Sequence, residues 1–390
     1  MPREDDVQGL SREASEVIYL DYNATAPLRP EAWAAMSEAL LRVGNASSAH
    51  TLGRWASERA ESARNEVGHL IGAAPNEIIF TSGATEANNL ALHAAAVRAQ
   101  RVVVSAVEHP AVLEAARALP VADLRIIGVD EDGLLLLDEL EDAVAGSGGS
   151  VVSVMAANNE TGVLTDLAAI TKITRRAGAL LHVDATQLVG KLPMNLSLLD
   201  IDLLSLSAHK FGGPQGVGAL FLRRGCPVAF EPLLRGGGQE RGWRSGTLNV
   251  AGVVGMGAAA RAAADQLEVE RRRVMTLRDH LEAGILATVN GVERNGHPDF
   301  RLPGVSSLAF RGIPADALLS AMPGVAASDG SACASGALTP SHVLLAMHRS
   351  REHAESTVRF SLGHATTAAE IEEAIMQVGD AVRRVRTAMS

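Results

Sequence analysis

The chain has 390 residues, of which 47% are hydrophobic and only 3% aromatic, and its formal net charge at pH 7 is −10. This length is enough for two domains with buried cores, while the acidic balance excludes the basic surface typical of nucleic-acid-binding proteins. No apolar run reaches the roughly 18 residues that a membrane-spanning helix needs.

The N-terminal part is predicted to be a leader followed by a loop and a helix. Residues 1–17 are acidic and polar and contain no apolar signal-peptide core, so we expect a cytoplasmic protein. The polar segment from Asp21 to Pro27 is predicted to be a loop. Pro30 then begins a helix that extends from Glu31 to Leu41.

Strands and helices alternate regularly through the first two thirds of the chain. Helices are expected at residues 54–71, 87–99 and 167–177. Strands are expected at residues 77–80, 101–107, 124–129, 151–155, 180–184, 203–206 and 218–222. This alternation predicts an α/β domain, residues 18–255, with a mostly parallel seven-stranded sheet.

Composition changes near residue 255, where we place the boundary of a smaller α+β domain, residues 256–390. A long helical stretch from Ala251 to Val289 is followed by expected elements at residues 306–310 (strand), 316–321 (helix) and 357–362 (strand). The last helix is expected to begin at a capping box formed by Thr367 and Glu370.

Asp184 and Lys210 follow two successive apolar strands of the larger domain. Because the carboxyl ends of parallel strands meet at one edge of a sheet, we expect both side chains at that edge, where ligands bind. Pyridoxal phosphate requires such a pair, since a lysine forms a Schiff base with it and an acid pairs with its pyridine nitrogen. The alternative is a solvated lysine in a Gly-rich loop.

Other polar residues also follow the expected strands, and they suggest a ligand shared by several strand ends. They are Thr85, His109, Asn159 and His209. The turn at residues 81–86 precedes a helix, so its backbone N–H groups are suited to an anion. Taken alone, the turn also fits an ordinary strand-to-helix connection capped by Thr. The arginines of the Gly-rich loop at residues 235–247 would either bind an anion or be solvated.

The two cysteines lie in different surroundings. Cys226 lies in an Arg-Gly-Cys-Pro turn and is expected to be structural or on the surface. Cys333 lies in a run of Ala, Ser and Gly residues that lacks bulky side chains, so we expect an exposed loop. An exposed thiol is prone to oxidation, which favours a nucleophilic role over an incidental one without deciding between them.

From Tyr19 to Met389 the chain resembles the NifS-like cysteine desulfurases of the class V aminotransferase group. The segments that carry the resemblance are YLDYNATAPLRPEA, GNASSAH, FTSGATEANNLA, VEHPAVL, NNETGV, HVDATQLVGKLP, SAHKFGGPQGVGAL, GGGQERGWRSGTLNV, SDGSACASGALTPSHVL and VRFSLG. The resemblance implies fold type I of the pyridoxal-phosphate-dependent transferases.

The resemblance also implies roles for individual residues. Lys210 would carry pyridoxal phosphate, Asp184 would pair with its ring nitrogen, Gln187 would bind its phenolic oxygen and His109 would stack on the ring. The residues implied to bind the phosphate are Ala84, Thr85, Ser207, His209 and, from the second subunit of a homodimer, Thr247. Arg359 would bind the substrate carboxylate, with Asn45 and Asn159 near the substrate.

The implied reaction converts L-cysteine to L-alanine. Lys210 would take the Cα proton, and the Cys333 thiolate would attack the substrate sulfur and become a persulfide. No resident metal is expected, although Cys333 is a candidate transient ligand of a cluster held with a scaffold protein. Asp329 replaces the usual Ser or Thr, and we expect its charge to raise the pKa of the Cys333 thiol.

The length of the segment after Cys333 matches the branch of the family that serves iron–sulfur cluster assembly and tRNA thiolation by passing sulfur to scaffold proteins. Three alternatives remain at this point. They are a selenocysteine lyase that does not depend on Cys333, a catalytically silent scaffold subunit, and a desulfurase dedicated to one pathway such as DNA sulfur modification.

Overall fold

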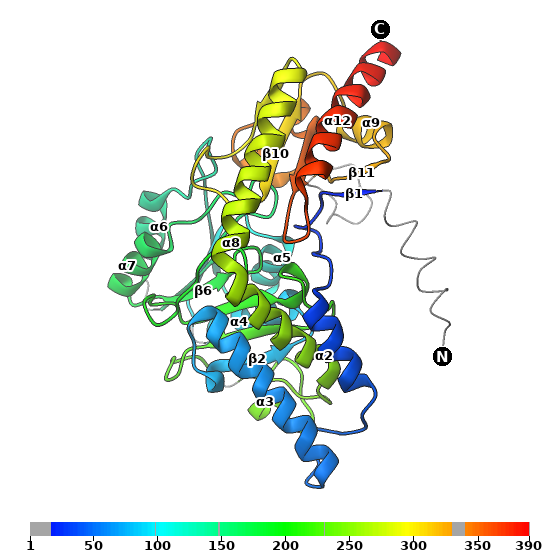
Figure 1. Ribbon diagram of the computed structural model, residues 1–390. Coiled ribbons are helices and arrows are strands. Elements are labelled where there is room, and N and C mark those ends of the chain that lie inside the picture. Colours follow the sequence, from blue (N-terminus) through cyan, green and yellow to red (C-terminus); the bar gives the residue numbers. More distant parts are fainter. Residues whose placement is uncertain (1–16, 98, 147–148, 230, 330–339, 390) are drawn as a thin grey trace. The chain divides into compact units, whose positions relative to one another are not determined.

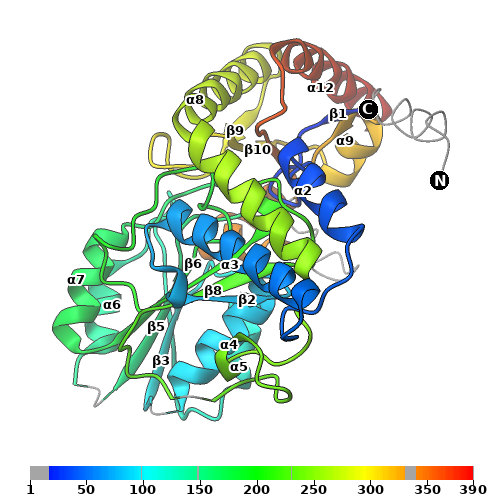
Figure 2. The same ribbon diagram turned by 60° about the horizontal axis from the view of Figure 1, so that its bottom comes forward.

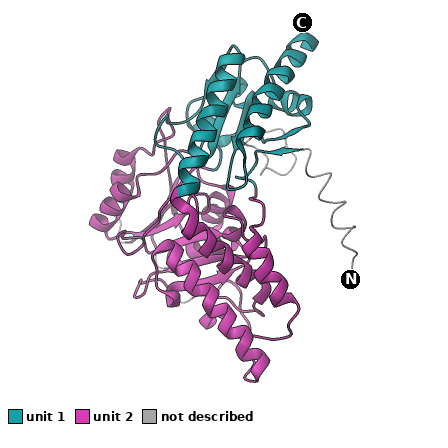
Figure 3. Ribbon diagram, in the orientation of Figure 1, with its two compact units in different colours: residues 1–24, 159–162, 269–390 teal, residues 25–158, 163–268 magenta. Residues whose placement is uncertain are grey.

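The computed structural model (Figure 1) describes residues 17–97, 99–146, 149–229, 231–329 and 340–389. The chain forms a larger compact unit, residues 25–158 and 163–268, and a smaller one, residues 1–24, 159–162 and 269–390 (Figure 3). The domain boundary expected near residue 255 stays a prediction, and both it and the division between the units fall inside the single helix α8 (Val250–Thr288).

The larger unit contains a seven-stranded sheet in the order β2-β8-β7-β6-β5-β3-β4. Its strands are β2 (Ile78–Thr81), β3 (Arg101–Ser105), β4 (Asp123–Ile127), β5 (Ser150–Met155), β6 (Leu180–Asp184), β7 (Leu203–Ser207) and β8 (Gly218–Leu222). Strand β8 is antiparallel to both of its neighbours, and the other neighbouring pairs are parallel. The expected α/β fold with a mostly parallel seven-stranded sheet is confirmed.

Helices cover this sheet on both sides, with α6 and α7 on one side and α4 and α5 on the other (Figure 2). The helices of the larger unit, apart from the first part of α8, are α2 (Pro30–Leu40), α3 (Thr51–Ile71), α4 (Ala84–Ala96), α5 (Pro110–Ala118), α6 (Leu137–Val144) and α7 (Leu167–Ala177). The short 3₁₀ helices among the described residues are η2 (Pro75–Glu77), η3 (Ala208–Lys210) and η4 (Glu240–Gly242).

Local signals explain where these helices begin and end. The Asp166 side chain accepts a hydrogen bond from the Ala169 N–H and caps α7, which ends at Gly178 with φ +67°. Both features are typical helix boundaries. The short helices α5 and α6 were not predicted, although Pro110 at the start of α5 was an available signal.

The smaller unit has a three-stranded antiparallel sheet in the order β12-β10-β9 and a parallel pair, β1 with β11. Its strands are β1 (Ile18–Tyr19), β9 (Val292–Arg294), β10 (Val305–Phe310), β11 (Val325–Ala326) and β12 (Thr357–Ser361). Its helices, besides the second part of α8, are α9 (Ala315–Ala321), α10 (His342–Ala346), α11 (Arg351–Glu355) and α12 (Ala368–Met389).

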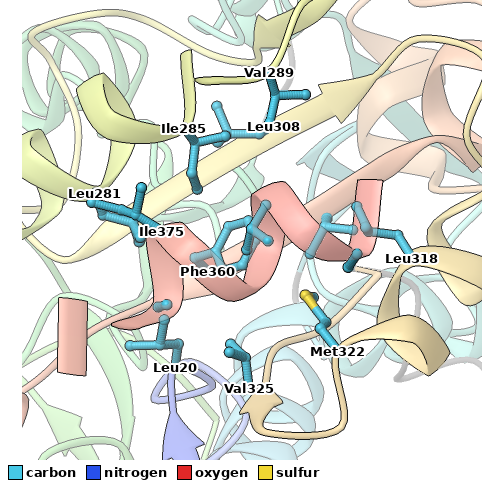
Figure 4. Close-up of a cluster of buried hydrophobic side chains, with 14 of the residues drawn as sticks. Leu20, Leu281, Ile285, Val289, Leu308, Leu318, Met322, Val325, Phe360 and Ile375 are labelled. Carbon is cyan, nitrogen blue, oxygen red and sulfur yellow. The ribbon is translucent and has the colours of Figure 1, made fainter. Parts of the chain in front are cut away.

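An apolar cluster of described residues forms the core of the smaller unit (Figure 4). Leu281 and Ile285 of α8 pack there with Phe360 of β12 and Ile375 of α12. The expected capping box is confirmed, since the Glu370 N–H donates to Thr367 Oγ1 and the Thr367 N–H donates to Glu370 Oε2. In the described part of the chain, no helix combines the length and apolar character needed to cross a bilayer.

Candidate active site

The sheet brings Asp184 and Lys210 to one edge of the larger unit. Asp184 is the last residue of β6, and Lys210 ends η3, which directly follows β7. Strands β6 and β7 are parallel neighbours, with Asp184 paired in register with Ser205. Their carboxyl ends therefore meet, and the half-buried Lys210 follows at the edge where open α/β sheets bind ligands.

The carboxylate of Asp184 is buried and held in place. Its Oδ2 accepts a hydrogen bond of 2.7 Å from Asn88 Nδ2 of α4, and its Oδ1 accepts one of 3.0 Å from the Thr186 N–H. Two other buried atoms here, Asn88 Oδ1 and Thr186 Oγ1, have no hydrogen-bond partner in the structure. Since an unpaired buried polar atom is costly, this surrounding suits a polar ligand that would complete it.

His182 lies on β6, two residues before Asp184, and is fully buried. Its Nδ1 is 2.8 Å from Ser153 Oγ and its Nε2 is 2.9 Å from Ser205 Oγ. Burial lowers the pKa of His182 to about 4, despite the opposing effect of Asp184. The imidazole is therefore neutral at pH 7 and leaves the charge of Asp184 available to a ligand.

The start of α4 forms a cradle for an anion. Its N-cap residue, Gly83, has φ +156° and provides no side-chain cap for the N–H groups of Ala84 and Thr85. A Cβ on Gly83 would lie 3.8 Å from Ser207 Oγ, so the Ser207 hydroxyl faces this turn. A helix start with N–H groups that no side chain caps, beside a hydroxyl group, is suited to a phosphate.

His209 lies next to Lys210 in η3. Its Nδ1 is 3.1 Å from Thr25 Oγ1, and its carbonyl accepts a hydrogen bond from the Ala26 N–H. Burial, together with the charges of Lys210 and Lys191, lowers the pKa of His209 to about 4. His209 is therefore suited to contribute a hydrogen bond rather than a positive charge at neutral pH.

These features fit pyridoxal phosphate. The larger unit has a lysine for the aldehyde, a buried acid for the ring nitrogen and an uncapped helix start for the phosphate. The atoms of Asn88 and Thr186 that lack partners lie next to the acid in the hydrogen-bonding network. Asn88 was missed by sequence reasoning, although it lies in the helix expected at residues 87–99, directly after the turn that contains Gly83.

His109 caps α5, because its Nδ1 accepts a hydrogen bond of 3.0 Å from the Ala111 N–H. In the neutral imidazole this places the ring proton on Nε2. Glu108 beside it is fully buried and accepts a hydrogen bond from the Met155 N–H. Burial, reinforced by Asp184, raises the pKa of Glu108 well above its usual value and so favours the neutral form of this carboxyl group.

Gln187 is buried, and its Oε1 accepts a hydrogen bond of 2.7 Å from Lys191 Nζ. Asn45 and Thr247 are exposed. The Asn45 side chain accepts a hydrogen bond from the Ser47 N–H within its own turn. The structure therefore gathers the expected phosphate and ring residues at the sheet edge, whereas Asn45 and Thr247 lie in exposed loops.

The loop that carries Thr247 is anchored by two ion pairs. Glu240 forms a buried bidentate pair with Arg64 of α3 and also accepts a hydrogen bond from the Phe80 N–H. Arg244 pairs with Glu86 in the first turn of α4 at 2.9 Å. The sequence allows either anion binding or solvation for the arginines of this loop, and Arg244 instead pairs with an acid of the same unit.

Arg359 and Asn159 come together in the smaller unit. Arg359 lies on β12 with 4% of its surface exposed. Its Nη1 donates to the Asn159 carbonyl at 2.9 Å, its Nη2 pairs with Asp21 Oδ1 at 2.7 Å, and its Nε is buried without a hydrogen-bond partner. A planar guanidinium with a remaining donor suits a carboxylate ligand.

Glu160 is a buried acid of the smaller unit that sequence reasoning did not select. Its Oε2 accepts a hydrogen bond from Ser341 Oγ at 2.5 Å. Burial raises its pKa to about 7, with Asp329 adding to the shift and Ser341 and Arg359 opposing it. Its position in NNETGV, directly after Asn159, was the only available signal.

Cys333 lies outside the described residues, as does most of the leader. Cys226 is half-buried, and burial raises its pKa to about 11. Within the described ranges, no group of three or more His, Cys, Asp or Glu side chains is arranged to hold a metal ion.

Comparison with known proteins gives consistent matches over nearly the whole chain. The family model described as aminotransferase class-V matches residues 18–374. The cysteine desulfurase IscS of Proteus mirabilis is 44% identical over 379 residues, which cover 95% of this chain and 93% of the relative. Among solved structures, a NifS-like protein from Rickettsia africae is 32% identical, with a TM-score of 0.86 and coverages of 94% and 99%. A structure described as SspA in complex with cysteine is 29% identical, with a TM-score of 0.78 and coverages of 88% and 98%.

Proposed function

Since the chain belongs to the class V aminotransferase family, whose members depend on pyridoxal phosphate, and is a NifS-like cysteine desulfurase, we propose that it uses Lys210 and Asp184 to bind this cofactor and Cys333 to accept sulfur. The observation that carries the cofactor assignment is the placement of Asp184 and Lys210 at the ends of parallel neighbouring strands. The substrate is L-cysteine, which the neighbour described with bound cysteine supports.

Each residue of the larger unit has a distinct task in this proposal. Lys210 Nζ would hold the aldehyde carbon, and Asp184, oriented by Asn88, would accept the hydrogen bond of the ring nitrogen. Gln187 binds the phenolic oxygen, and His109 covers the ring. The phosphate is held by Ala84, Thr85, Ser207 and His209. When bound, pyridoxal phosphate supplies an electron sink for a carbanion at the substrate Cα.

The chain's own residues then move protons and orient the substrate. The Lys210 amine removes the Cα proton, a task for which a lysine must be neutral. Arg359 binds the substrate carboxylate, and Asn45 and Asn159 lie along the substrate. In the absence of substrate the guanidinium of Arg359 is neutralised by Asp21, which keeps its buried charge paired.

Cys333 completes the reaction as a thiolate. Its sulfur forms a bond with the substrate sulfur while the substrate Cβ–S bond breaks, and the released electron pair on Cβ takes up a proton. One L-cysteine and one thiol therefore give one L-alanine and one persulfide, with no external oxidant or reductant. The persulfide then passes to an acceptor, for which we propose a scaffold protein of iron–sulfur cluster assembly in the cytoplasm.

We also propose that the enzyme is a homodimer, in which Thr247 reaches the phosphate of the partner subunit. Large apolar side chains are exposed on α2, on the segment that follows it and in the first turn of α3, as expected for an interface. They are Trp33, Leu40, Leu41, Val43 and Leu52. Thr247 is exposed on a loop anchored by Glu240 and Arg244, which suits a residue that acts outside its own subunit.

The test compares wild-type holoenzyme with Cys333→Ala and with Cys226→Ala as the matched control, because the raised pKa of Cys226 makes its thiol unreactive. All three should keep the visible absorbance of bound pyridoxal phosphate. With L-cysteine and a thiol reductant, wild type and Cys226→Ala should release alanine and sulfide, and Cys333→Ala neither.

Two outcomes would contradict the proposal. If Cys333→Ala turned over L-cysteine at the wild-type rate, Cys333 would be incidental, and a lyase of the selenocysteine type would fit better. If no visible band appeared after pyridoxal phosphate was added to wild type, the cofactor assignment at Lys210 would be wrong.

A further inference from the structure

Residues 330–339, which include Cys333, are bordered by two described chain segments, and Glu160 binds one of them while the preceding residue, Asn159, binds Arg359, which pairs with the other. On the C-terminal side, Ser341 Oγ donates a hydrogen bond to Glu160 Oε2 and accepts one from the Leu344 N–H, as the N-cap of α10. The Ser341 hydroxyl is therefore fixed in one orientation between the carboxyl group and the helix.

On the N-terminal side, Ser328 is held by the strand that carries Arg359. The Ser328 N–H donates to the Arg359 carbonyl at 3.1 Å, and the Arg359 N–H donates to the Ser328 carbonyl at 2.6 Å. The side chain of the same Arg359 binds the carbonyl of Asn159, the residue before Glu160. Both borders of the Cys333 segment are thus tied, directly or through Arg359, to the Asn159–Glu160 dipeptide.

We propose that Glu160 is a positioning residue for sulfur transfer: it binds Ser341 at one border of the segment that carries Cys333, its charge acts on Arg359, which pairs with the other border, and its ionisation controls how firmly these borders are held. The proposal rests on Cys333 as the sulfur acceptor, and it adds a regulatory residue to that assigned reaction. Glu160 is not assigned a contact with cofactor or substrate.

The charges around Glu160 decide the direction of the effect. Arg359 of β12 attracts the ionised carboxylate, Asp329 repels it, and Asp21 neutralises part of the Arg359 charge. A charge-assisted hydrogen bond from Ser341 is roughly twice as strong as a neutral one. Because burial raises the pKa of Glu160 to about 7, the carboxyl group changes charge across neutral pH. Above pH 7 it is ionised, and its hydrogen bond with Ser341 is then the stronger, charge-assisted one.

The experiment measures persulfide on Cys333 in single-turnover reactions of the holoenzyme with L-cysteine from about pH 6 to about pH 8.5. In wild type the rate of persulfide formation should rise with pH through a transition near pH 7, and this rise is separate from the one caused by ionisation of the thiol. Glu160→Gln, which keeps an acceptor for Ser341 but no charge, should lack the transition near pH 7. Ser341→Ala should lower the rate by about tenfold, and Ser341→Thr should restore it.

A second measurement distinguishes a positioning role from a general loss of cofactor binding or folding in the variants. Exchange of the Cα proton of L-alanine with deuterium requires Lys210 and the cofactor but no transfer to Cys333, so every variant should keep its wild-type rate. The proposal is wrong if exchange and persulfide formation fall in parallel, or if Glu160→Gln and Ser341→Ala both retain the wild-type pH profile. If wild type itself forms no persulfide on Cys333, the assigned function fails instead, which is a distinguishable result.

Discussion

At the scale of single residues, two buried carboxyl groups in the described part of the smaller unit have opposite electrostatic surroundings. Burial would raise the pKa of Glu282, but hydrogen bonds from Arg301, Arg294 and Ser306 lower it to about 2. Glu160 has the opposite balance, since burial and Asp329 outweigh Ser341 and Arg359 and raise its pKa to about 7. Similar burial thus gives one acid that stabilises the fold when ionised and one that destabilises it.

The two acids predict opposite dependences of stability on pH. Glu160 binds a proton more tightly in the folded state, so its ionisation reduces stability as pH rises from about 4.5 to about 7. Glu160→Gln should therefore raise the free energy of unfolding by about 1–3 kcal/mol at pH 8 and by less than about 1 kcal/mol at pH 5.

Glu282→Gln provides the matched comparison. Its folded pKa is lowered, so the stability it contributes is fully present above about pH 4.5 and is lost only below it. The substitution should lower the free energy of unfolding by about 2–3 kcal/mol at both pH 5 and pH 8. Urea unfolding at the two pH values measures both variants, and an equal pH dependence of the two would contradict the assignment of the shifts.

At the scale of elements, the cradle at the start of α4 depends on close packing of β8 against the turn before it. A Cβ on Gly218 would lie 2.6 Å from Gly83 Cα, a backbone atom that cannot move without displacing the turn. Gly218→Ala should therefore weaken pyridoxal phosphate binding by about tenfold, as measured by absorbance titration. Unaltered affinity would show that the phosphate is bound elsewhere.

Gly379 in α12 is the control for this substitution. A Cβ there would meet only Arg383 Nη1, at an ordinary 3.6 Å. Gly379→Ala should leave cofactor affinity unchanged and raise helix stability by about 0.5–1 kcal/mol, since alanine loses less backbone entropy.

At the scale of the whole molecule, the proposed dimer predicts a link between assembly and cofactor binding. Leu41 and Val43 are 88% and 81% exposed, and Leu41→Glu with Val43→Glu should yield a monomer by light scattering. Because Thr247 of the partner would then be absent, pyridoxal phosphate should also bind more weakly. Leu198→Glu alters a residue of the larger unit that is 80% exposed, and it should leave mass and affinity unchanged. A dimer that persisted in the double variant would place the interface elsewhere.

The sequence by itself determined the α/β alternation, the seven strands of the larger sheet and the residues at their carboxyl ends. These follow from patterns that are local along the chain: short apolar runs for β6 and β7, Pro30 for α2 and the capping box for α12. The family segments then indicated the cofactor and the reaction. Short elements such as α6 and β9 were missed because they contain too few residues to show a period.

Only the tertiary structure decided which side chains support the site residues. Asn88 meets Asp184 across 96 positions of sequence, and Ser341 meets Glu160 across 181, so no local pattern contains either contact. The charge states of His182, His209 and Glu160 likewise depend on burial and on neighbours from other segments. Desolvation of a side chain and its pairing with charged neighbours are properties of the packed chain. The sequence therefore identified the residue types of the site, but it could not predict their ionisation.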